Sequence, residues 1–81
     1  MSASFARELF NREVVGSGGE SLGVVKDVNL DLVTGSINEI HVRCHASIDP
    51  TKLPWPSDSD VVRLPIDVIG RIAERIHLNV Q

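Results

Sequence analysis

The alternation of apolar and polar residues between Leu22 and His45 constrains the fold of this chain more than any other feature of its sequence. Successive side chains of a β-strand point to opposite faces of a sheet, so a period of two is typical of a half-buried strand. Two such arms flank the turn sequence Val33-Thr34-Gly35-Ser36. The pattern therefore predicts an antiparallel β-hairpin that packs one of its faces on a core.

The second arm of this hairpin separates apolar from polar side chains without interruption. Its apolar face carries Ile40, Val42 and Cys44, and its polar face carries Glu39, His41, Arg43 and His45. The polar face bears charges and imidazoles but no arrangement that indicates a reaction. We therefore take its residues as candidates for an interaction surface.

The first arm contains one break in the pattern. Its apolar residues of one parity are Leu22, Val24, Val28 and Leu30, and Lys26 interrupts the series. A β-bulge near Lys26-Asp27 would bring Val25 onto the same face as Val28 and would sharpen the curl of the strand. Closing a small barrel requires such a curl.

Shorter segments precede and follow the hairpin. They are a strand at Glu13–Val15, a glycine turn at 16–19, a strand at 61–64 stopped by Pro65, a helical turn at Ile66–Ile69 broken by Gly70, and a closing strand that alternates at Ile76, Leu78 and Val80. In the helical turn, Ile66 and Ile69 are expected to face the core. Residues 2–12 favour a helical turn, with residues 1–8 as a flexible or capping segment that covers one end of the core or anchors a partner.

Length and composition limit the chain to one small domain, residues 1–81. The apolar share of 42% and the charged share of 23% are those of a folded protein. A net charge of -3 and three aromatic side chains argue against nucleic-acid binding. A lone Cys44, no signal-peptide pattern and no long apolar run predict a soluble, cytoplasmic protein without direct membrane insertion.

The patterns that suggest chemical sites fail on geometry. The glycine loop lacks phosphate-binding spacing and precedes a strand rather than a helix. Asp27, Asn29 and Asp31 alternate along a strand and so spread apart, whereas calcium ligands converge in a loop. His41 and His45 would lie about 13 Å apart on a strand, too far to share a zinc ion. Cys44 points away from its neighbour His45, so we predict no catalytic, cofactor or metal site.

A segment without periodicity runs from Ala46 to Asp60 and contains Leu53-Pro54-Trp55-Pro56 at its centre. Irregular segments of this length are often functional loops. The flanking prolines restrict the backbone beside Trp55, which lowers the entropy lost when the ring docks, and tryptophan is a favoured interface anchor. Two interpretations stay open: Trp55 and Leu53 contact a partner, or Trp55 folds back over the open end of the barrel.

Three motifs follow one another along the chain: G-x-x-L-G-x-V-x-D-V from Gly19 to Val28, D-x-x-T-G from Asp31 to Gly35, and L-P-x-x-x-I from Leu64 to Ile69. Their order over residues 9–80 resembles a PRC-barrel domain. This resemblance implies an all-β fold, a small antiparallel barrel with one short helical turn near Ile66–Ile69. The motifs are mostly core and turn positions, and the family supplies no catalytic residues to carry over.

Proteins that resemble this chain fall into three settings: a photosynthetic reaction-centre subunit with a membrane anchor, a ribosome-maturation factor with a second β domain, and stand-alone archaeal proteins of about this length. The last implies a non-enzymatic, dimerising or polymerising adaptor in archaeal-type cell division. Its partners would be the membrane anchor of the tubulin-like division ring and paralogous PRC-barrel proteins. The alternative is a ribosome-maturation accessory that binds a ribosomal protein.

Overall fold

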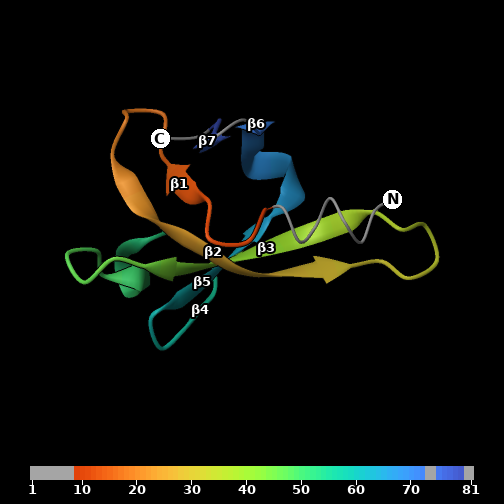
Figure 1. Ribbon diagram of the computed structural model, residues 1–81. Coiled ribbons are helices and arrows are strands. Elements are labelled where there is room, and N and C mark those ends of the chain that lie inside the picture. Colours follow the sequence, from red (N-terminus) through yellow and green to blue (C-terminus); the bar gives the residue numbers. More distant parts are fainter. Residues whose placement is uncertain (1–8, 73–74, 80–81) are drawn as a thin grey trace.

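The computed structural model describes residues 9–72 and 75–79, which form one curved β-sheet (Figure 1). Its strands are β1 (Glu13–Val15), β2 (Ser21–Leu30), β3 (Ile37–Cys44), β4 (Ser57–Asp58), β5 (Val61–Pro65), β6 (Ile69–Ile72) and β7 (Ile76–Leu78), with the 3-10 turns η1 (Pro50–Lys52) and η2 (Ile66–Val68). The predicted mainly β fold is confirmed. The helical turn predicted at residues 2–12 falls largely outside the described residues, and Val80 lies wholly outside them.

The β2–β3 hairpin forms the centre of the sheet, whose strand order is β4-β5-β3-β2-β1-β7-β6. Strands β5 and β4 extend it antiparallel on the β3 side. On the other side β1 pairs antiparallel with β2 but parallel with β7, where Val14 lies opposite Ile76. The sheet is therefore mixed and differs from the antiparallel expectation at this pair, because β7 enters beside β1 in the same direction.

The predicted bulge is present in β2. Val25 lies opposite Val42 and Asp27 opposite His41, so Lys26 has no counterpart in β3. The extra residue places Val25 in the core, fully buried, while Lys26 is exposed and Val24 only half-buried. The phase of the apolar pattern thus changes where the strand bends.

Gly23, which precedes the bulge, allows β2 to pair on both of its edges. It lies opposite Val14 of β1 and opposite Cys44 of β3. A β-carbon at this position would overlap the backbone oxygen of Arg43. Only glycine permits this close backbone approach.

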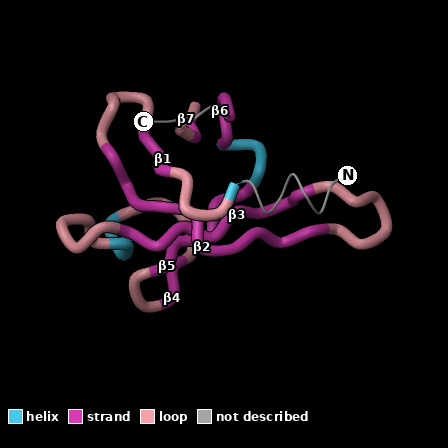
Figure 2. Tube along the Cα trace, in the orientation of Figure 1, coloured by secondary structure: helices cyan, strands magenta, loops and turns pink. Residues whose placement is uncertain are grey.

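The sheet folds over so that β1, β7 and β6 lie on one side of the core and β2, β3 and β5 on the other (Figures 1 and 2). Both halves contribute to one cluster of fully buried side chains. These are Leu9, Val14, Val25, Ile40, Val42, Val62, Leu64 and Ile76. Burial of such aliphatic groups is the main source of folding free energy, and it is concentrated around the centre of the hairpin.

Two expectations for the second half of the chain are wrong. The segment predicted to be irregular up to Asp60 includes β4, in which Asp58 pairs with Val61 across a tight turn. Ile66 was expected to face the core but is 37% exposed. The backbone is already extended at Ile69, so the helical spacing that would place both isoleucines on one side ends at Val68, and Gly70 lies within β6.

Candidate interaction surface

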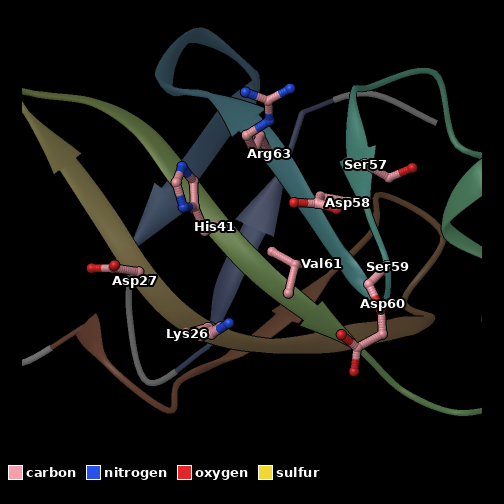
Figure 3. Close-up of a pocket in the computed structure, with 9 residues that line it drawn as sticks. All are labelled: Lys26, Asp27, His41, Ser57, Asp58, Ser59, Asp60, Val61 and Arg63. Carbon is pink, nitrogen blue, oxygen red and sulfur yellow. The ribbon is translucent and has the colours of Figure 1, made fainter.

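A groove of about 620 Å³ opens on the outer face of the sheet beside the β4–β5 turn (Figure 3). This is the face opposite the core, because Ile40, Val42 and Val62 are buried while their neighbours along the chain point outward. The charged lining residues are Lys26, Asp27, Asp58, Asp60 and Arg63, with His41 between them. The groove therefore offers both signs of charge to a binding partner.

Strand register brings the central lining residues together. Asp27 of β2 lies opposite His41 of β3, and His41 lies opposite Arg63 of β5. Residues opposite one another in neighbouring strands have their side chains on the same face, with β-carbons about 5 Å apart. One polar row therefore crosses three strands.

Two further polar contacts involve residues in and beside this row. His41 Nε2 lies 2.9 Å from Glu39 Oε1, and the more exposed Arg43 Nε lies 3.8 Å from Asp60 Oδ2. Arg43 and Asp60 are exposed, and an exposed ion pair contributes about 0–1 kcal/mol. Within residues 9–72 and 75–79, the side chains of Lys26 and Arg63 make no ion pair, so both cations are available for recognition.

The Trp55 loop leads directly into β4 at the edge of the groove. Trp55 and Leu53 are partly buried and pack against the core cluster. The preceding turn η1 is held by Asp49, whose Oδ1 accepts hydrogen bonds from the Thr51 hydroxyl at 2.7 Å and the Thr51 backbone N–H at 3.0 Å. Both hydrogen bonds lower the pKa of Asp49, and the bond from the Thr51 hydroxyl has the larger effect. The loop is thus fixed locally and keeps part of the indole accessible.

The structure groups some of the predicted interface residues and separates others. Glu39, His41 and Arg43 share the outer face of β3. His45 lies beyond the end of β3, where its Nε2 is 2.9 Å from Ser21 Oγ. Their role as an interface stays a prediction, and His45 belongs to a different cluster.

That cluster is a polar clasp formed by Glu13, Ser21, His45 and Arg75. Arg75 Nε donates to Glu13 Oε1 at 2.8 Å. The Ser21 hydroxyl and then the Arg75 guanidinium lower the pKa of Glu13 by hydrogen bonding to its carboxylate. In a catalytic triad the carboxylate contacts the histidine, whereas here it contacts the serine. The clasp joins Glu13 of β1 and Ser21 of β2 to His45, which follows β3, and to Arg75, which directly precedes β7.

Cys44 lies on the core side of β3 and is 7% exposed. Burial, and secondarily the charge of Asp60, raise the pKa of its thiol. A thiol that stays protonated and covered is a poor nucleophile. Cys44 therefore acts as a small core residue.

Leu32 and Val33 at the tip of the β2–β3 hairpin are the functional candidates that sequence reasoning missed. They are 93% and 94% exposed. The turn is set by Asp31, which accepts the Val33 backbone N–H at 2.9 Å, and by Gly35 at φ 74°. The sequence does carry a signal for them. Leu32 and Val33 occupy the two variable positions of the D-x-x-T-G motif, where the alternation of the flanking strands does not call for apolar residues.

The part of the chain that the structure describes contains no group of three or more His, Cys, Asp or Glu side chains able to hold a metal ion. Over the same residues, no helix has the length and apolar character needed to cross a bilayer.

Comparison with protein-family models gives a match to the PRC-barrel domain over residues 1–79 of the 81-residue chain. A search of curated proteins gives no match. The matched range includes the whole described sheet, the groove and the clasp.

Proposed function

This chain belongs to the PRC-barrel domain family, whose domain is a small interaction module. We propose that it works as a non-enzymatic, homodimerising adaptor in archaeal-type cell division. In this proposal it links components of the division ring in the cytoplasm, at mid-cell. Its partners are the membrane anchor of the tubulin-like ring and related PRC-barrel proteins.

The observation that supports this proposal best is the charged groove beside the Trp55 loop. It combines available cations, Lys26 and Arg63, with the carboxylates of Asp58 and Asp60. A two-fold interface uses the same patch on both copies, so a patch with both signs of charge is able to complement itself. The same charges can also pair with an oppositely arranged patch on a related protein.

Light scattering of the purified chain over a concentration series tests the dimer. We expect a dimer that Arg63→Glu weakens, because the reversed charge faces carboxylates across the two-fold axis. Lys52→Glu is the matched control, since Lys52 is an exposed cation on η1 outside the groove lining. A monomer of 8.8 kDa at high micromolar concentration would overturn self-association.

Trp55→Ala tests whether the Trp55 loop beside the groove takes part in association. Because Trp55 also packs on the core cluster, the thermal unfolding of the variant must be measured alongside its association. Weaker association at a temperature where the variant is folded supports an interface role. Unchanged association together with a lower Tm assigns the indole to the core alone.

The cellular role is tested by tagging the chain in its own cells. We expect mid-cell localisation and recovery of division-ring proteins with the tagged chain. Recovery of small-subunit ribosome precursors without division proteins would overturn the adaptor role in favour of ribosome maturation.

A further inference from the structure

The hairpin tip and the last strand in the sheet order, β6, carry apolar surfaces of matching character. Leu32 and Val33 project from the turn between β2 and β3, which extends away from the rest of the sheet (Figure 1). An apolar pocket of about 330 Å³ lies along β6, lined by Ile66, Ile69, Gly70 and Ile72. Every lining residue is isoleucine or glycine.

The tip has no structural reason to be apolar. The Gly35 N–H donates to the Asp31 backbone carbonyl at 2.7 Å, and the Val33 N–H donates to the Asp31 carboxylate at 2.9 Å. These bonds do not involve the side chains of Leu32 and Val33, which contribute nothing to the core cluster. Large apolar side chains exposed together mark sites of association.

The pocket lies at a terminal strand of the sheet. Strand β6 stands last in the strand order and pairs only with β7 among the described strands. Ile66 on its rim is 37% exposed. A terminal strand with an apolar flank is a surface that another chain can cover.

We propose that Leu32 and Val33 of one copy insert into the Ile66–Ile69–Gly70–Ile72 pocket of a second copy of this chain. The inference rests on the self-association proposed above and adds a contact distinct from the charged groove. The pocket is open to solvent and lined by isoleucine and glycine, so branched aliphatic side chains from outside can contact it. A second copy is favoured because the same chain carries both halves of the contact.

A membrane surface is the less suitable occupant for the tip. Asp31 lies beside it, Asp27 and Glu39 lie further along the same hairpin, and the chain has a net charge of -3. Anionic lipid headgroups attract basic rather than acidic segments. Binding to anionic vesicles that depends on Leu32 and Val33 would overturn the proposal.

Disulfide trapping tests the contact directly. Val33→Cys protein is mixed with Ile66→Cys protein under a copper–phenanthroline oxidant, and the native Cys44 is buried in both. We expect a cross-linked heterodimer to form at least about tenfold faster than in the control mixture with Lys52→Cys, whose residue is exposed and outside the pocket. Equal rates, or faster linkage of Val33→Cys to itself, would overturn the proposal.

A complementation experiment gives an independent readout. Leu32→Ser/Val33→Ser protein keeps its pocket, and Ile66→Lys protein keeps its tip. Each variant alone should associate at least about tenfold more weakly than the unmodified chain, as expected for loss of two buried aliphatic groups. Mixing them should restore one contact and produce a heterodimer.

The outcomes separate this inference from the proposed function. An unmodified chain that stays monomeric overturns both. An unmodified chain that associates while the tip and pocket variants associate equally well overturns the tip contact and leaves the groove proposal standing.

Discussion

The two ends of the β2–β3 hairpin belong to the same pair of strands but differ in what surrounds them. At the base, Gly23 and Cys44 lie opposite each other, and β1 and β5 pair with the outer edges of the two strands. Towards the tip, the pairs continue to Leu30 and Ile37 without a third strand in the described sheet. Alternation specifies a hairpin, whereas burial depends on the neighbouring strands.

The difference has an energetic consequence. A two-stranded hairpin is marginally stable in water, whereas additional strands and an apolar face give independent stability. The base therefore carries the folding free energy, and the tip is available for contacts outside the molecule. Substitutions at matched positions can break or sharpen this contrast.

The largest contrast is expected between Ile40→Ala and Leu32→Ala. Ile40 is 0% exposed and Leu32 is 93% exposed. Truncating a buried isoleucine costs about 2–5 kcal/mol, and a surface substitution changes stability by about 0.5 kcal/mol or less. Urea unfolding monitored by circular dichroism measures both. Similar losses in the two variants would mean that the tip is part of the folding core.

The next effect is expected at Gly23, where β2 approaches the backbone of β3 closely. A methyl group in Gly23→Ala would overlap the Arg43 backbone oxygen, so we expect a loss of about 1–3 kcal/mol or more from overpacking. Gly18→Ala is the control, because its β-carbon would meet only the flexible end of Glu20 at 3.2 Å. If Gly23→Ala unfolds at the same denaturant concentration as Gly18→Ala, the two strands do not approach as closely as described.

Thiol reactivity compares base and tip without unfolding the protein. Burial raises the pKa of Cys44, while a cysteine introduced by Val33→Cys would lie at a position that is 94% exposed. We expect the tip thiol to react with an aromatic disulfide reagent at least about tenfold faster than Cys44, because the exposed thiolate is the nucleophile. Equal rates for the two thiols of the variant would show that the base opens readily.

Sequence reasoning succeeds where the determinant is local. The bulge at Lys26 follows from a phase change within one strand, and the turn before Gly35 follows from its turn residues. It fails at Ile66, because a 3-10 turn that passes directly into β6 removes the helical spacing. It also fails at Leu32 and Val33, because an apolar pair looks the same in sequence whether or not another strand covers it.

Non-local pairing explains the remaining differences. The parallel pair of Val14 with Ile76 joins segments far apart in the chain, and no local pattern specifies its direction. The charged groove likewise depends on β4, a strand too short and polar to be recognised from alternation. Of the candidate surface, the sequence indicated the face of β3 but not the carboxylates that complete it.

The smallest effect is expected from pH at the clasp. Hydrogen bonds from Ser21 and Arg75 lower the pKa of Glu13 in the folded chain relative to its ordinary value of 4.5. The unfolded chain therefore binds more protons just below pH 4.5, so stability falls as the pH drops through the folded-state pKa.

We expect Tm to fall more steeply below this pH in the unmodified chain than in Glu13→Gln, and Glu20→Gln should follow the unmodified chain. Because the clasp is exposed to solvent, salt should reduce the difference; identical profiles for Glu13→Gln and Glu20→Gln would show that the clasp does not hold the base of the hairpin.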